Sequence, residues 1–180
     1  MKEKIAVYLA CALTHVPRSE FKNYVCYLHS LANAIMLHCN ADVYYALRNS
    51  DPQISLVPNG QKAAYCYKLD RDLVNSVDIV IAECTYPSIG LGIELQLSYD
   101  FNKPLFLLFD GGEEHKAKPI SYINPGDGQH DLQIGEGNIS LMALGLPNIR
   151  RIINQRISQM EYSDLLLEID SIKKLLQLAV

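Results

Sequence analysis

The sequence predicts a single α/β domain, with a parallel sheet of about five strands flanked by helices on both faces. Short apolar runs alternate along the chain with helix-length amphipathic stretches, which is the pattern of parallel strands joined by crossover helices. The run at 79–82 is continuously apolar, as expected for a central strand that is buried on both faces. The 180 residues provide one hydrophobic core and no second. We therefore expect residues 1–180 to form one domain.

Five apolar runs account for the strands of this sheet. They lie at 5–10, 42–47, 79–82, 104–109 and 149–153. We expect them to follow the order of flavodoxin-like and Rossmann-like domains, in which ligands bind beyond the carboxyl ends of the strands. Polar side chains near those ends are therefore candidates for a site. They are Thr14, His15, Glu83, Thr85 and Asp110, and Tyr8 lies within the first strand.

Amphipathic stretches account for the helices. In 19–38, apolar residues recur at steps of three and four, which places them on one face of a helix. Pro17 and Ser19 supply start signals for this helix. Three further helices are predicted at 63–76, 91–101 and 164–178.

Two segments are predicted to be irregular. Residues 48–61 contain two prolines and a glycine among polar residues, so we expect a loop there. Residues 110–138 contain six glycines and two prolines and are predicted to form a long irregular insertion. Loops of this length are usually functional or disordered.

Charge and composition exclude several classes of function. The 16 Lys and Arg residues against 20 Asp and Glu give a net charge of −4, without the positive excess that binding to a nucleic acid polymer requires. The five cysteines form no C-x-x-C pair, so neither a disulfide framework nor a zinc site is indicated, and we expect a cytoplasmic protein. No stretch approaches the roughly 20 apolar residues of a membrane span. No two histidines have metal-ligand spacing, so no metal is expected.

The segment 78–95 is the most informative part of the chain. It reads as a strand, a tight turn and the start of a helix. Ser88, Gly90 and Gly92 place small residues where the free amides of a helix N-terminus point outward, which suits an anion. Glu94 is expected to face the same crevice. The alternative is an ordinary helix cap, with Glu94 serving only as a partner of the helix dipole.

The stretch from Asp70 to Phe109 resembles the nucleoside 2-deoxyribosyltransferase-like family, and most closely its 2'-deoxynucleoside 5'-phosphate N-hydrolases. The resemblance rests on an Asp in the preceding helix, an apolar strand ending in Ala-Glu, the motif TYPSIGLGIEL, and FNK before the next strand. A spacing of 24 residues between Asp70 and Glu94 agrees with it. Weaker support comes from Tyr8 and from the segment at 140–142.

The resemblance implies three catalytic residues. Glu94 would be the nucleophile that attacks the anomeric carbon and forms a glycosyl-enzyme intermediate. Asp70 would be the acid or proton relay that assists departure of the base, and Tyr8 would hold the carboxylate of Glu94 in line. Asp72 ranks second to Asp70, because on a helix it points about 200° elsewhere. Taken singly, Tyr8 also fits simple packing and Asp70 a solvated helix position.

The resemblance also implies a phosphate pocket and an assembly. Ser88 would bind the 5'-phosphate together with Gly90 and Gly92, and Ser140 would complete the pocket from a neighbouring subunit of a homodimer or larger homo-oligomer. Ser140 alone also fits a cap or turn. The segment 10–15 lacks the hydroxyl and guanidinium groups that the hydrolases place there, and His15, Arg18 and Arg48 are candidates to replace the charge.

Three functions remain open at this point. The first is hydrolysis of the N-glycosidic bond of a (deoxy)nucleoside 5'-monophosphate. The second is transfer of the deoxyribosyl group between bases, which differs only in whether water or a base resolves the intermediate. The third is a nucleotide-binding or signalling module of the same fold without turnover. The chemistry needs no cofactor, because two carboxylates suffice for glycosidic cleavage.

Overall fold

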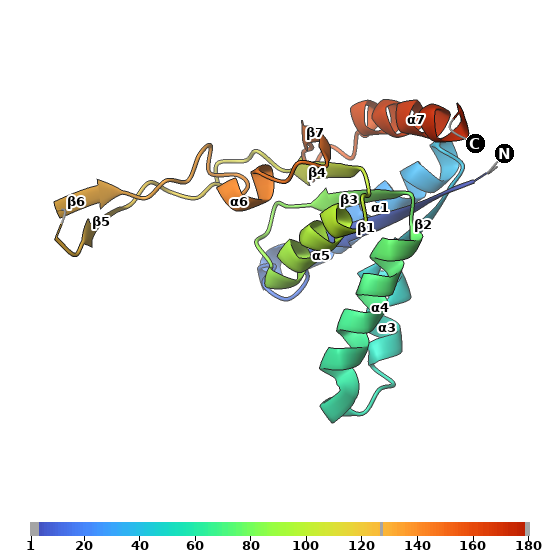
Figure 1. Cartoon of the computed structure of the whole chain (residues 1–180), viewed down its shortest axis with the longest axis horizontal. Helices are drawn as coiled ribbons and strands as arrows, with labels where there is room; N and C mark the ends of the chain where they lie inside the picture. The colour runs from blue at the N-terminus through green and yellow to red at the C-terminus, as the bar shows by residue number, and fades with distance from the viewer. Residues whose placement is uncertain (1–3, 127, 179–180) are drawn as a thin grey trace.

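The computed structural model of the chain describes residues 4–126 and 128–178, and it is built around one five-stranded parallel sheet. The strand order is β2-β1-β3-β4-β7, which is the flavodoxin-like order expected for this alternation of elements. The predicted fold class is therefore confirmed (Figure 1). The strands are β1 (Ile5–Cys11), β2 (Ala41–Tyr45), β3 (Ile79–Glu83), β4 (Leu105–Phe109) and β7 (Ile149–Asn154).

Helices cover both faces of the sheet. Side chains alternate between the two faces along each strand, so each face has its own core. One face packs against α1 (Arg18–His38) and α7 (Ser163–Leu178), and its core includes the side chains of Val7, Leu9 and Ile81. The opposite face packs against α4 (Lys62–Ser76) and α5 (Ile89–Asp100), and its core includes Tyr8 and Val80. Tyr8 and Val80 are register partners on neighbouring strands. Tyr8 thus faces α4 and α5.

The segment predicted as a loop at 48–61 is helical over most of its length. The segment begins within α2 (Ala46–Asn49), which directly follows β2. It also contains α3 (Asp51–Ile54) and the 3₁₀ helix η1 (Asn59–Gln61). The two prolines do not prevent these turns. Pro52 lies in the first turn of α3 and Pro58 just before η1, positions where the missing N–H would have no helical partner in any case.

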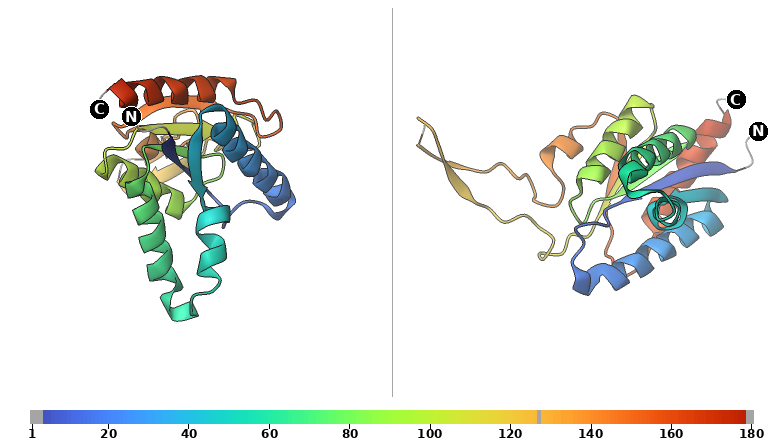
Figure 2. Two further views of the ribbon diagram at one scale, coloured as in Figure 1. Left: turned by 90° about the vertical axis from the view of Figure 1, so that its right-hand side faces the viewer. Right: turned by 90° about the horizontal axis from the view of Figure 1, so that it is seen from below.

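The insertion at 110–138 is more regular than predicted. It holds an antiparallel hairpin of β5 (Ser121–Asn124) and β6 (Gly128–Asp131). Gly126 and Gly128 have φ angles of +93° and +87°, which only glycine adopts without strain, and these residues allow the reversal. We call residues 117–126 and 128–137 the arm. The arm projects away from the rest of the structure in Figure 1 and in the right-hand view of Figure 2.

After the arm, the chain forms the one-turn helix α6 (Leu141–Leu144) before it enters β7. Helix α5 begins at Ile89, two residues earlier than predicted, because the Ser88 side chain caps it. Among the described residues, no helix is long and apolar enough to cross a membrane.

Candidate active site

Helix α5 lies against the sheet and divides its surroundings into two flanks. Leu91, Leu95 and Ser98 are buried beneath the helix. Ser88 Oγ accepts a hydrogen bond from the Leu91 amide at 3.4 Å, which satisfies one of the free donors of the first turn. Glu94 lies on the flank toward β1 and α4, whereas the opposite flank borders a cavity. The predicted site residues are distributed between these two flanks.

On the first flank, Tyr8 and Glu94 form a direct hydrogen bond. The Tyr8 hydroxyl donates to Glu94 Oε1 at 2.6 Å. Tyr8 is fully buried, and Glu94 is half-buried. Burial raises the pKa of Glu94 to about 8; the Tyr8 hydrogen bond opposes this shift, and the negative charge of Asp70 adds to it. A carboxyl group with such a pKa holds a proton more readily than an ordinary glutamate.

Asp70 joins this cluster from α4. Cys66 Sγ donates to Asp70 Oδ2 at 3.4 Å, one helical turn away. Burial raises the pKa of Asp70, and the side chains of Cys66, Ser50 and Tyr8 oppose the shift. The other carboxyl oxygen, Oδ1, is buried and has no hydrogen-bond partner among the residues that the structure describes. An unpartnered buried carboxyl oxygen is costly, so the geometry leaves Asp70 with one oxygen free for a ligand.

The neighbouring Asp72 is placed differently. Its side chain is exposed and forms a surface ion pair with Arg71 at 3.2 Å. Asp72 therefore points away from Glu94, while Asp70 points toward it.

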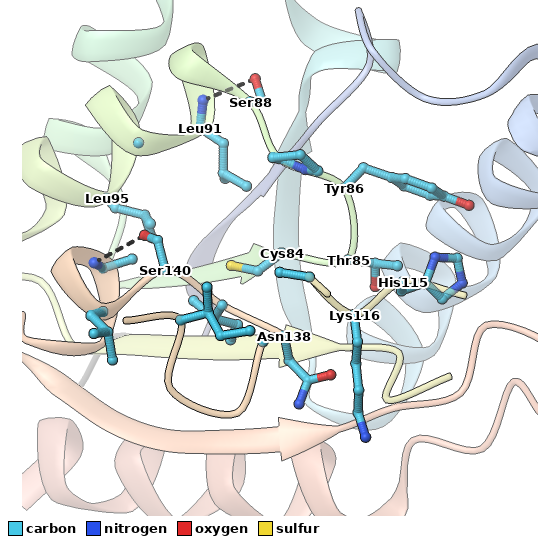
Figure 3. Close-up of a pocket in the computed structure, with 18 of the residues that line it drawn as sticks. Cys84, Thr85, Tyr86, Ser88, Leu91, Leu95, His115, Lys116, Asn138 and Ser140 are labelled. Atoms are coloured by element: carbon cyan, nitrogen blue, oxygen red, sulfur yellow. Dashed lines mark hydrogen bonds between the residues drawn. The ribbon is translucent and has the colours of Figure 1, made fainter. Parts of the chain in front are cut away.

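On the second flank, α5 borders a cavity of about 520 Å³. Ser88 and Gly92 of α5 line it together with α6 and the root of the arm (Figure 3). Ser140, which the resemblance places in the pocket of a neighbouring subunit, lines this cavity of its own chain, as Ser88 does. Its hydroxyl accepts a hydrogen bond from the Ala143 amide at 3.3 Å and caps α6.

The expectation that Ser88, Gly90, Gly92 and Glu94 face one crevice is wrong in part. Ser88 and Gly92 line the cavity, whereas Gly90 and Glu94 do not. The reason is the helical rotation of about 100° per residue, which turns Glu94 toward β1 and α4. The cavity and the Tyr8–Glu94–Asp70 cluster are thus neighbours across α5 and share no lining residue.

The two glycines of α5 keep its first turns free of side chains. A Cβ atom at Gly92 would meet nothing within 4 Å, and one at Gly90 would meet only Ser88 Oγ at 3.7 Å. Packing within this chain therefore does not require glycine at either position. Glycine here leaves the backbone open to close approach, as at anion-binding helix N-termini.

The basic residues at the cavity are not those that the sequence suggested. His15, Arg18 and Arg48 do not line it. His115 and Lys116, which directly precede the arm, do. The His115 ring packs edge-on against Tyr86, with 5.2 Å between centroids, and Lys116 Nζ lies 2.5 Å from Glu113 Oε1. The sequence did not point to these two residues, because they lie in the insertion, whose path it does not predict.

A second carboxylate centre lies on the opposite face of the sheet. Glu83 ends β3 and is fully buried. It accepts hydrogen bonds from the Tyr24 and Thr85 hydroxyls and from the Thr85 amide. Burial raises its pKa to about 7, against these hydrogen bonds. Thr85 Oγ1 in turn accepts from the Asp110 amide at 2.8 Å.

Asp110 continues this network toward the surface. The guanidinium of Arg156 donates to Asp110 Oδ1, and the Ile157 amide donates to Oδ2, each at 3.0 Å. These hydrogen bonds tie β3, β4 and α1 to the segment after β7. Within the described parts of the chain, no group of side chains has the arrangement of a metal site.

Comparisons with known proteins find relatives of part of the sequence and solved structures with a similar fold. No protein-family model matches the chain. Over 58 residues the chain is 36% identical to the 5-hydroxymethyl-dUMP N-hydrolases of Rattus norvegicus and Mus musculus. The match covers 30% of this chain and 36% and 34% of those relatives, so the chain spans about a third of their length.

Two solved structures are similar over most of the chain. A conserved protein from Enterococcus faecalis V583 has 16% sequence identity and a TM-score of 0.54, covering 93% of this chain and 98% of that one. The CMP N-glycosidase BcmB of Clostridium botulinum has 20% identity and a TM-score of 0.48, covering 89% and 98%. The first of these similarities agrees with the fold described above.

Proposed function

We propose that the chain is a nucleotide N-hydrolase of the nucleoside 2-deoxyribosyltransferase-like family, which cleaves the N-glycosidic bond of a (deoxy)nucleoside 5'-monophosphate. The observation that carries this proposal is the cluster of two carboxyl groups and a buried tyrosine, Tyr8–Glu94–Asp70, beside the open N-terminal turns of α5. The local similarity to 5-hydroxymethyl-dUMP N-hydrolases supports the same chemistry.

In this mechanism the two carboxyl groups share one proton. Burial raises the pKa of both carboxyl groups, and the charge of Asp70 raises the pKa of Glu94 further. The pair therefore favours a singly protonated state. In the reactive state Glu94 is ionised and attacks the anomeric carbon, while the C–N bond breaks. Protonated Asp70 gives its proton to the departing base. Water then attacks the glycosyl ester, returns a proton to Asp70 and frees Glu94.

Tyr8 positions the nucleophile. Its hydroxyl donates to Oε1 of Glu94 at 2.6 Å, which leaves Oε2 as the attacking oxygen. The hydrogen bond also favours the ionised form of Glu94 and opposes the effect of burial. The pKa of Tyr8 is itself raised well above its usual value, by burial and by the charge of Glu94, so Tyr8 remains a donor at neutral pH.

The phosphate is assigned to the N-terminus of α5, at Ser88 and the amides beside Gly90 and Gly92. A helix rises about 1.5 Å per residue, so Ser88 and Glu94 are separated by about 9 Å along the axis. That distance suits a nucleotide whose 5'-phosphate lies at Ser88 and whose anomeric carbon lies at Glu94. The substrate would cross the first two turns of α5, where glycines leave room for it.

The test is a chromatographic assay of base release from a panel of nucleoside 5'-monophosphates and the corresponding nucleosides. We expect the wild-type protein to release base from a monophosphate, and Glu94→Gln to lower the rate at least about a thousandfold while it still binds the nucleotide. Base exchange that requires an added acceptor base would indicate a transferase instead. Nucleotide binding without release across the panel would contradict an enzymatic function.

A further inference from the structure

The cavity beside α5 is larger than a nucleoside 5'-monophosphate requires. In the proposed function only the 5'-phosphate of the substrate reaches it, at Ser88. The sugar lies toward the other flank of α5, where the Tyr8 hydroxyl meets Glu94. A single phosphate group would fill a small part of 520 Å³, a volume within the range of complete small-molecule sites. Most of the cavity is therefore left for another group.

The floor of the cavity is apolar. Leu91 and Leu95 of α5 line it, together with Cys84 after β3 and Ile139 before α6. Each of these four residues is more than nine-tenths buried. Burial also raises the pKa of the Cys84 thiol well above its usual value, so this side chain stays uncharged. Such a floor suits the face of a flat, uncharged ring.

Asn138 places an unused hydrogen-bond acceptor at the cavity. Its side-chain oxygen Oδ1 is buried and has no partner among the residues that the structure describes. An unpaired buried acceptor is costly, so a ligand that donates a hydrogen bond to it is favoured. Figure 3 shows Asn138 across the cavity from Ser88 and Leu91. The group that reaches this far side should carry an N–H or O–H donor, as the amino group of a nucleobase does.

The charges at the cavity favour an anion between these two ends. No Asp or Glu is among the described residues that line it, whereas Lys116 and His115 both do. Lys116 is paired with Glu113, whose carboxylate is exposed, and a surface ion pair of this kind is weak. The Lys116 amine is therefore available to a ligand. Because the N-terminal turn of α5 also favours negative charge, the cavity suits a second phosphate beyond the one at Ser88.

We propose that the substrate is a dinucleotide, in which a diphosphate joins the nucleotide to be cleaved to a second nucleotide, and that the cavity binds this second half. The inference rests on the proposed function and names its substrate class. The second phosphate faces Lys116, and the second base packs on the apolar floor and donates to Asn138 Oδ1. A nucleotide is the occupant because it supplies the negative charge, the flat ring and the donor within one group.

The second half leaves the chemistry of cleavage unchanged. The C–N bond breaks in the half beside Glu94, the departing base takes a proton from Asp70, and water resolves the glycosyl ester. The products are the free base and a molecule that keeps both sugars, both phosphates and the second base. The second half acts by binding, since contacts to a remote part of a substrate raise kcat/KM when they are kept in the transition state.

The test compares pairs of substrates that differ only in the second half. The 5'-monophosphates of adenosine, cytidine, uridine and their deoxy forms are each assayed beside the dinucleotide in which a diphosphate joins them to AMP. We expect kcat/KM for base release to be at least about tenfold higher for the dinucleotide of a pair. Base release from monophosphates with no gain for the dinucleotides would overturn the inference and leave the proposed function standing.

Binding is measured separately from turnover, by calorimetry on the Glu94→Gln protein. Each dinucleotide should bind at least about tenfold more tightly than the matching monophosphate, and we call this ratio of Kd values the dinucleotide advantage. Tighter binding without base release by the wild-type protein would contradict the proposed function but support the cavity as the site of the second half. Equal binding of both members of every pair would overturn the inference.

Two lysines separate the cavity from the surface beside it. Lys116→Gln removes the charge that faces the second phosphate, and it should lower the dinucleotide advantage at least about fivefold. Lys118→Gln is the matched control, because Lys118 is exposed two residues further on and does not line the cavity. The control variant should keep the advantage of the wild-type protein.

A pair of asparagines tests the far end of the cavity. Asn138→Leu keeps a similar volume but removes the acceptor, and it should also lower the dinucleotide advantage at least about fivefold. Asn23→Leu is its control, because Asn23 is exposed on α1 and does not line the cavity. Circular dichroism verifies the fold of every variant. Equal effects of the test and control variants would place the second half outside this cavity and overturn the inference.

Discussion

Asp70 and Asp72 stand two residues apart on α4 in opposite environments, and their variants separate catalysis from surface charge. Asp70 is part of the Tyr8–Glu94 cluster, whereas Asp72 forms an exposed ion pair. We expect Asp70→Asn to lower the rate of base release about a hundredfold, and most for bases that leave poorly as anions. Asp72→Asn should stay within about twofold. Equal rate losses for good and poor leaving bases would assign Asp70 to positioning.

The raised pKa of Glu94 makes a prediction about stability. Its folded-state pKa of about 8 exceeds the ordinary value of 4.5, so the folded protein binds the proton more tightly than the unfolded chain does. Stability is then greatest below about pH 4.5 and falls as the pH rises toward 8. Glu94→Gln removes this dependence.

The measurement is denaturant unfolding of the wild-type protein and Glu94→Gln at pH 5.5 and 8.5. From pH 5.5 to 8.5, the unfolding free energy of the wild-type protein should fall by roughly 2 kcal/mol more than that of the variant. This figure allows for the partial exposure of the Glu94 side chain. The contributions of other titrating groups cancel in the comparison. A variant that loses more stability than the wild-type protein would contradict a raised pKa.

At the scale of elements, the first turns of α5 carry two glycines, so part of the helix surface there is bare backbone. Gly92→Ala meets no atom within 4 Å and replaces a poor helix former, so it should stabilise the fold by about 0.5–1 kcal/mol. The added methyl group would nevertheless intrude where the nucleotide approaches, and we expect activity to fall at least about tenfold. Thermal unfolding and the base-release assay measure the two effects on the same protein.

Gly60→Ala is the control for this change. Gly60 also has nothing within 4 Å of its Cβ position, but it lies in η1, away from the cavity lining. Its activity should not change. If Gly92→Ala retains full activity, the substrate does not pass along this side of α5.

The elements that the sequence predicts well are those whose pattern is long and local. The apolar run of β3 and the three-to-four-residue period of α1 indicate their elements because each needs only its own residues to define a buried face. The one-turn helices α2 and α3 and the hairpin of the arm carry too few residues for a period, and their prolines and glycines are common to loops and tight turns alike. Their structure depends on neighbours.

The sequence predicts part of the candidate site and misses the rest for the same reason. The resemblance over 70–109 identifies Glu94 and Asp70 as candidates. Which flank of α5 the Glu94 side chain occupies depends on how that helix packs through Leu91 and Leu95. The placement of Lys116 and Ser140 at the cavity depends on the path of the arm. No local pattern encodes either fact.

Across the whole molecule, the sheet separates two carboxyl centres. Glu94, on α5, faces β1 and α4, and among the described residues its hydrogen-bond donor is Tyr8. Glu83 faces α1 and receives three, from the Tyr24 and Thr85 hydroxyls and the Thr85 amide. A carboxyl group whose lone pairs are occupied by the protein serves the fold, whereas one with a free oxygen is available to a substrate.

The two centres should therefore respond in opposite ways to the same chemical change. Glu83→Gln presents an amide donor to groups that are themselves donors, and it should cost about 1–3 kcal/mol of unfolding free energy. The activity of each folded molecule should stay within about threefold of wild type. Glu94→Gln should abolish base release without loss of stability at pH 8. Stability and activity measured for both variants at one pH decide the assignment, because a Glu83→Gln protein that is stable and inactive would move the chemistry to the opposite face of the sheet.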